Sequence, residues 1–166
     1  ETALGIGLIL LLALASPALG MKLGMPGARV VDQGRSSRDG YDTLVENFGP
    51  GAAAPLFITV GATEAQAVVD AAKLDNGVAD VRIVAEPSAG TGRTVVRVIP
   101  TTAVDNKATS DLVARLRHTM EQAAPTASVG GPAAQNHDLT GVLTGKAPIA
   151  IAVIAVIAFL LLLTVF

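Results

Sequence analysis

The sequence contains no cysteine and no tryptophan, and aromatic residues of any kind are rare. Among 166 residues there are one Tyr and four Phe. Without Cys, the chain can form no disulfide, no catalytic thiolate and no zinc site built on thiolates. With so few aromatic residues and a formal net charge of −2, it has neither the stacking surface nor the basic field that nucleic-acid binding requires. We therefore expect no nucleic-acid partner.

Charged residues are also scarce, at 16% of the chain against about 25% in an ordinary soluble domain. All 12 Lys and Arg lie between Lys22 and Lys146, and of the 14 Asp and Glu only Glu1 lies outside that span. Two uncharged ends therefore flank one polar middle, whose length suits one small domain.

The uncharged C-terminal run, residues 147–166, is long enough to cross a bilayer. A helix rises about 1.5 Å per residue, so this run spans roughly 30 Å, the thickness of the hydrocarbon core. Pro148 lies near its start, and Lys146 just before it can reach the lipid headgroups. We predict a transmembrane helix at 147–166, truncated here, because the run reaches Phe166 without a charged residue and the natural chain is expected to continue.

The N-terminal apolar run, Ala3 to Leu19, is at the short end of the spanning range. A signal peptide is the alternative, since Ala13-Leu14-Ala15 resembles a cleavage site, although no basic residue precedes the run. We predict a transmembrane helix over residues 1–20, with the signal peptide left open.

Glycine and proline interrupt the chain after this run, so residues 21–55 are expected to be a connector. Ser36 or Ser37 is expected to cap a short amphipathic helix, which Gly49-Pro50-Gly51 ends. The apolar residues on one face of this helix are Tyr41, Leu44, Val45 and Phe48.

Residues 56–130 show alternating strand and helix patterns. Short β-branched runs indicate strands, and apolar residues spaced i, i+3, i+4 indicate helices. In chain order we predict a strand at 56–60, a helix capped by Thr63 and Gln66, strands at 80–85 and 93–99, a helix capped near Asp105 or Thr109, and a strand at 126–129. The order β-α-β-β-α-β is the ferredoxin-like, or split βαβ, pattern.

The predicted fold class is therefore α+β, a ferredoxin-like domain at 56–130 with two flanking transmembrane helices. Helices should cover one face of a four-stranded, mainly antiparallel sheet, and the other face should be wet or covered by a partner. Residues 131–146 are expected to form a linker helix leading to the second span.

Several strings occur in a fixed order between the two apolar runs. They are LGMP at Leu23 to Pro26, SRDGYDTLVENFGPG at Ser37 to Gly51, then PLFITV, DLVARLRHTM and SVGGPAAQNHDLTGVL. Together they resemble the MMPL family of the RND transporter superfamily, over nearly the whole chain. The matching stretch lies in the second half of such a transporter, from the helix that opens that half to the helix after its porter domain. Gly40 departs from the family pattern, because a helix former is more usual before the Tyr.

The resemblance implies a multi-pass, proton-driven exporter of lipids or other hydrophobic molecules in the cell membrane. Residues 21–146 would be extracytoplasmic and contribute a porter domain to the substrate path. The implied partners are the lipid bilayer, the rest of the same transporter chain including its other porter domain, and a hydrophobic or lipid substrate. Proton relays need ionisable residues inside membrane helices, and neither run contains one, so no relay residue is assigned. The alternative function is a membrane-anchored extracytoplasmic binding or sensor module.

The sequence contains no pattern typical of catalysis or metal binding, so we expect no enzyme, no cofactor and no metal. His118 and His137 lack a second His or a carboxylate at metal-ligand spacing and are expected at the surface. Gly90-Thr91-Gly92 lacks the Lys of a phosphate loop and is interpreted as a turn. The serines that lie in no nucleophile elbow are Ser36, Ser88 and Ser128.

Phe48 and Phe57 are expected in the core rather than along a substrate path, and no substrate-binding residue is assigned. Gly49-Pro50-Gly51 and Gly130-Gly131-Pro132 are interpreted as tight turns. We expect the domain to move as a semi-rigid body hinged at such connections. On this hypothesis, Ala-Ala in place of Gly130-Gly131 should lower export and leave folding nearly intact.

Overall fold

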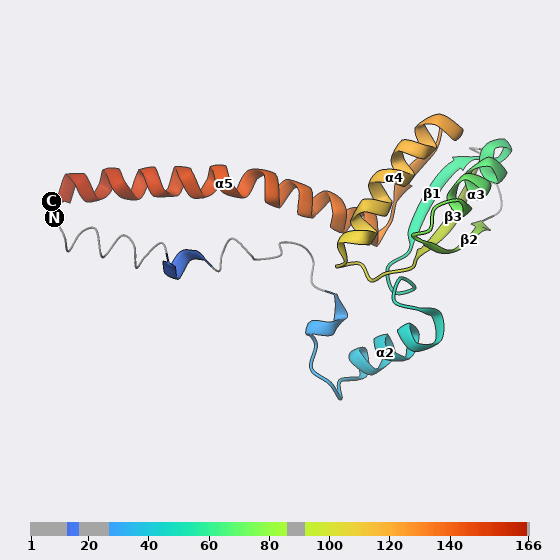
Figure 1. Ribbon diagram of the computed structural model, residues 1–166, viewed down its shortest axis with the longest axis horizontal. Coiled ribbons are helices and arrows are strands. Elements are labelled where there is room, and N and C mark those ends of the chain that lie inside the picture. The colour runs from blue at the N-terminus through green and yellow to red at the C-terminus, as the bar shows by residue number, and fades with distance from the viewer. Residues whose placement is uncertain (1–12, 17–26, 86–91, 166) are drawn as a thin grey trace.

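The computed structural model describes residues 13–16, 27–85 and 92–165 of the chain. In chain order its elements are η2 (Ala28–Val30), α2 (Ser36–Phe48), β1 (Leu56–Gly61), η3 (Ala62–Glu64), α3 (Ala65–Lys73), β2 (Val78–Ala85), β3 (Arg93–Pro100), α4 (Lys107–Ala123), β4 (Ser128–Gly130) and α5 (Pro132–Val165). The protein is α+β, with a small sheet domain from which α5 extends as a long single helix (Figure 1). Apart from the helical turn at 13–16, the predicted helix over 1–20 lies outside the described residues.

The four strands form one sheet in the order β2-β3-β1-β4, and every neighbouring pair is antiparallel. Each pair of strands joined by a helix is separated in the sheet by one strand, β3 between β1 and β2, and β1 between β3 and β4. The predicted four-stranded antiparallel sheet is confirmed.

Burial alternates along the central strands, because successive side chains in a strand point to opposite faces. The side chains of one face, which point toward α3 and α4, are fully buried, whereas Phe57 on the other face is 36% exposed. The apolar stripes of both helices complete the core. The buried residues of this core include Leu56, Ile58, Val60, Val96 and Val98 from the strands, Val68, Val69 and Ala72 from α3, and Leu112, Val113, Leu116 and Met120 from α4.

Three helices begin differently from the sequence prediction. Thr63 and Gln66 do not form a capping box, because residues 62–64 form the 3-10 turn η3, which leads directly into α3. The amide of Gln66 instead donates to Asp70 Oδ1 at 2.9 Å, one helical turn further on.

Helix α4 begins after Asn106, rather than at Asp105 or Thr109 as predicted. The Asn106 side chain accepts a hydrogen bond from the Ala108 amide at 2.9 Å, the usual role of an Asn at this position. Thr109 is buried in the first turn, where its hydroxyl donates to the Ala103 carbonyl oxygen at 2.8 Å.

The predicted amphipathic helix is present as α2, but no side chain caps it, since Arg35 precedes it and Ser36 is its first residue. Gly49 ends the helix with φ +85°, a conformation that favours glycine. No residue of α2 is buried.

The predicted linker helix and the predicted second span form one continuous helix, α5, of 34 residues with Pro148 in its interior. A proline inside a helix removes one backbone hydrogen bond, which long apolar helices tolerate. In the part of the chain that the structure describes, α5 is the helix long and apolar enough to cross a membrane, from Pro132 to Thr164.

Candidate functional site at the junction of the sheet domain and the apolar helix

Gly131 connects β4 to α5 and is tightly packed. Its φ is +100°, and a Cβ atom there would lie 2.8 Å from the Pro55 carbonyl oxygen and 3.1 Å from the Phe57 ring. At Gly130, by contrast, the nearest atom would be 4.0 Å away. The structure therefore contradicts the expectation that Ala-Ala at this pair would leave folding nearly intact, because a side chain at Gly131 meets both backbone strain and a clash.

The first turn of α5 belongs to the core of the sheet domain. Ala133 and Ala134 are each 1% exposed and pack in the core cluster. Asn136 is 8% exposed, and its side-chain amide donates to the carbonyl oxygen of Val104 at 2.8 Å. This contact fixes α5 to the loop that precedes α4.

Two further contacts join α5 to α4. Ser110 Oγ and His137 Nδ1 share a hydrogen bond of 2.6 Å. The guanidinium of Arg117 donates to both oxygens of Asp138, at 2.6 and 2.9 Å, and this bond raises the pKa of Arg117. His137, which the sequence placed at the surface, is thus part of the junction.

His118 lies on the exposed side of α4, where its Nε2 is 3.2 Å from the amide nitrogen of Gln122. No group of three or more His, Cys, Asp or Glu side chains that could hold a metal ion occurs among the described residues. The side chains of the junction bind one another and hold α5 to the sheet domain.

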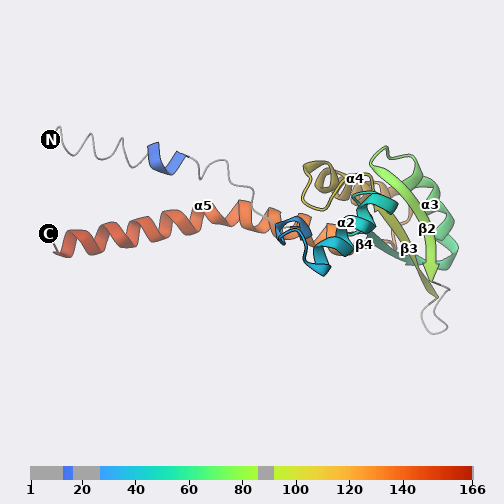
Figure 2. The ribbon, with the colours of Figure 1, turned by 90° about the horizontal axis from the view of Figure 1, so that it is seen from below.

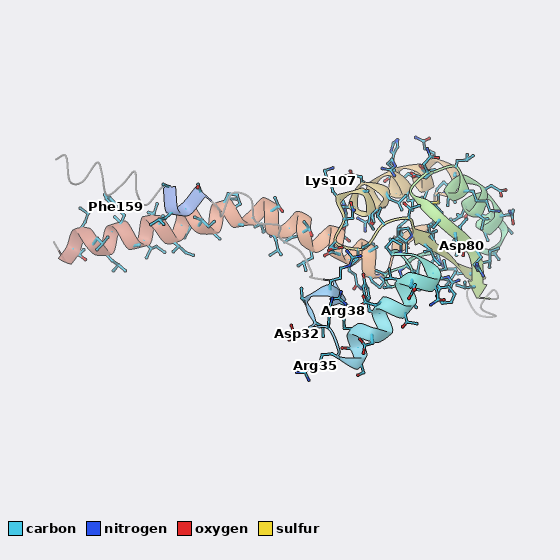
Figure 3. All side chains as sticks on the ribbon, turned by 60° about the horizontal axis from the view of Figure 1, so that its bottom comes forward. Asp32, Arg35, Arg38, Asp80, Lys107 and Phe159 are labelled. Atoms are coloured by element: carbon cyan, nitrogen blue, oxygen red, sulfur yellow. The ribbon has the colours of Figure 1, made fainter. Side chains whose placement is uncertain are left out.

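Arg38 of α2 holds the segment that carries η2 against this helix. Arg38 donates through Nε to Asp42 at 2.8 Å, and through Nη1 to the carbonyl oxygens of Arg29 and Val31 at 2.9 and 3.2 Å. Figure 3 shows Arg38 between α2 and the segment that carries η2. This contact could not be predicted from the sequence, because Arg29 lies nine positions before Arg38 and no local pattern links them.

The expected core positions of the two aromatic residues are wrong. Phe48 is 69% exposed at the end of α2, and Phe57 is 36% exposed on the open face of the sheet. The expected turn at Gly90-Thr91-Gly92 lies outside the described residues except for Gly92, which has φ +61°. Ser88 also lies outside them.

Sequence comparisons give consistent matches. The model of the MMPL family matches residues 59–166. "Membrane protein YdfJ" of Bacillus subtilis (strain 168) is 30% identical over an alignment of 166 residues that covers 96% of this chain and 23% of the relative. The chain thus spans about a quarter of the length of this curated relative. No solved structure matches the chain significantly.

Proposed function

The chain belongs to the MMPL family, and from this premise we propose that it is part of a proton-driven, RND-type exporter of lipids or other hydrophobic molecules. The whole transporter would be a multi-pass protein of the cell membrane, with residues 21–146 outside the cytoplasm. The observation that carries the proposal is the match of the family model over residues 59–166, which includes helix α5 and all of the sheet domain except the first three residues of β1.

The part of the exporter formed by residues 56–130 is a ferredoxin-like porter domain in this proposal. The strand order β2-β3-β1-β4, with one strand inserted inside each β-α-β unit, supports the split βαβ assignment. Around it we place a membrane helix at 1–20, the connector at 21–55, the linker at 131–146 and the membrane helix at 147–166. The porter domain would contribute to the path of the hydrophobic substrate, together with the porter domain of the other half.

Coupling between membrane and porter domain would pass through α5. The contacts of Asn136, His137 and Asp138 make the first turns of α5 move with the domain. The hinge that the sequence suggested at Gly130-Gly131 is therefore better placed further along α5, at Pro148. There the missing N–H leaves the Thr144 carbonyl without its helical partner, and Gly145 adds no side-chain packing.

Export itself is the first test. Cells that lack the full-length gene should accumulate a hydrophobic compound that complemented cells export, and a protonophore should abolish that export. Pro148→Ala in the full-length protein should lower export without lowering protein abundance, whereas Ala147→Leu, a neighbouring change that leaves the backbone hydrogen bonds intact, should not. Equal lipid profiles in all strains, together with a reading frame that holds no further apolar spans, would favour the membrane-anchored sensor.

A further inference from the structure

The face of the sheet turned away from α3 and α4 carries a row of four residues, one from each strand. Gly130 of β4 pairs with Phe57 of β1, Phe57 with Arg97 of β3, and Arg97 with Arg82 of β2. Figure 2 shows β2 and β3 beside each other, and α3 and α4 both pack in the core on the opposite face of the sheet. The row therefore crosses the whole open face at its middle.

The two arginines in this row are electrostatically unfavourable in the isolated domain. Arg82 and Arg97 lie directly opposite each other, and like charges at such positions destabilise a sheet. Arg82 is partly compensated by Asp80 of its own strand, whose Oδ2 lies 2.8 Å from Arg82 Nε, and Figure 3 labels Asp80 on β2. Arg97 has a buried Nε with no hydrogen-bond partner among the residues that the structure describes. A buried donor without an acceptor is costly, so an acceptor supplied from outside the described residues would stabilise this position.

Apart from Arg82 opposite it, the neighbours of Arg97 on this face are apolar. Val95 and Ile99 flank it on the same face of β3 and are half-buried, and Phe57 lies across from it on β1. An arginine among aromatic and aliphatic side chains is the typical composition of the centre of a protein interface.

We propose that this open sheet face docks against another segment of the same full-length polypeptide, and that this segment presents an Asp or Glu carboxylate to Arg97 within an apolar surface. The inference rests on the proposed function in that it takes the chain as part of a larger transporter. The curated relative is about four times as long as the stretch matched here, so most of such a protein lies outside this chain.

A protein surface is favoured over a lipid headgroup for two reasons. The row spans four strands, which suits a broad contact rather than a single headgroup. The sheet also lies at the Pro132 end of α5, opposite to the end that holds the uncharged run, so it stands away from the segment that would lie in the bilayer (Figure 1).

Photo-crosslinking in the full-length protein in native membranes tests the proposal. With p-benzoyl-L-phenylalanine in place of Phe57, we expect ultraviolet light to join this position to a peptide of the same polypeptide from outside residues 1–166, and that peptide should contain an Asp or Glu. The same amino acid in place of Leu74, which is 85% exposed at the end of α3, should give no such product.

Arg97→Gln should lower the yield of the Phe57 product by about tenfold, as expected when one partner of a buried charged pair is removed. Arg97→Lys keeps the positive charge and should restore part of the yield, which separates loss of the ion pair from loss of folding. Crosslinks to phospholipid, to other proteins or to nothing, or a yield unaffected by Arg97→Gln, would overturn the proposal. Export measured on the same samples separates failure of the proposed interface from failure of the proposed function. A crosslink without export contradicts the proposed function alone. Export without a crosslink contradicts the interface alone.

Discussion

Gly131 is the residue whose replacement should affect stability most directly. Its left-handed φ of +100° and the nearby Pro55 oxygen leave no room for a side chain, so Gly131→Ala should lower the free energy of unfolding by about 1–3 kcal/mol. Thermal unfolding of the purified protein in detergent measures this. Gly130→Ala is the matched control, since its Cβ would have space. Equal melting temperatures for the two variants would contradict the assignment.

Asp75 makes the stability of the fold depend on pH. Arg115 donates to both of its oxygens at 2.7 and 2.9 Å and the Gly77 amide donates at 2.8 Å, and these bonds hold the pKa of Asp75 below its ordinary value of 3.8. Because the folded pKa lies below the unfolded one, the carboxylate stabilises the fold above pH 3.8 and loses this contribution as the pH falls toward the folded pKa.

Asp75→Asn should therefore lower stability at neutral pH and flatten the loss of stability below about pH 4. Chemical denaturation at a series of pH values measures both effects. Asp70→Asn, a nearby carboxylate whose described bond is to the neutral Gln66, serves as the control. A slope in acid that is the same in wild type and Asp75→Asn would show that this pair does not contribute.

The contact between α5 and the loop before α4 depends on Asn136. Asn136→Ala removes the donor to Val104 and leaves a partly buried carbonyl oxygen unpaired, which should cost about 1–3 kcal/mol. In this variant, hydrogen exchange should speed up, relative to the unsubstituted protein, more in the first two turns of α5 than in the strands. Gln135→Ala, on the exposed side of the same turn, should change neither quantity. Unchanged hydrogen-exchange protection of α5 in Asn136→Ala would contradict a role of the contact with Val104 in holding α5 to this loop.

The regular elements were predictable because their signals are local. The alternation in Arg93 to Ile99 and the spacing of Leu112, Val113 and Leu116 each lie within a few residues, and the structure confirms both elements. Of the two caps predicted for α4, Asp105 lies one residue before the observed cap Asn106 and Thr109 lies three residues after it. Several polar residues there can cap a helix, and the choice among them depends on backbone angles that the sequence does not reveal.

The contacts that join α5 to the sheet domain could not be predicted, because they link residues far apart in the sequence. Arg117 and Asp138 are separated by 21 positions, and Asn136 lies 32 positions after Val104. No periodic pattern connects such pairs. The continuity of α5 through Pro148 was also missed, because a proline near the start of an apolar run resembles the first turn of a new helix.

At the scale of the whole molecule, the described residues form a polar domain joined to a long helix with an uncharged second half. Residues 132–166, placed in a host membrane protein, should insert across the bilayer, as glycosylation mapping can measure. Ile154→Asp places a charge near the middle of the uncharged run and should lower insertion, since such a charge costs about 2.5–3.5 kcal/mol. Val142→Asp, outside that run, is the control, and equal insertion of the two variants would contradict a span at 147–166.

The length of α5 has a geometric consequence for the whole assembly. At about 1.5 Å per residue its 34 residues measure roughly 50 Å, while the hydrocarbon core takes up about 30 Å. On the proposed span at 147–166, the remaining length of about 20 Å forms a stalk that holds the sheet away from the hydrocarbon core. A bend of about 20° at the proposed Pro148 hinge would move the far end of this stalk sideways by about 7 Å, so a small change of angle at one position is enough to open or close a gap above the membrane.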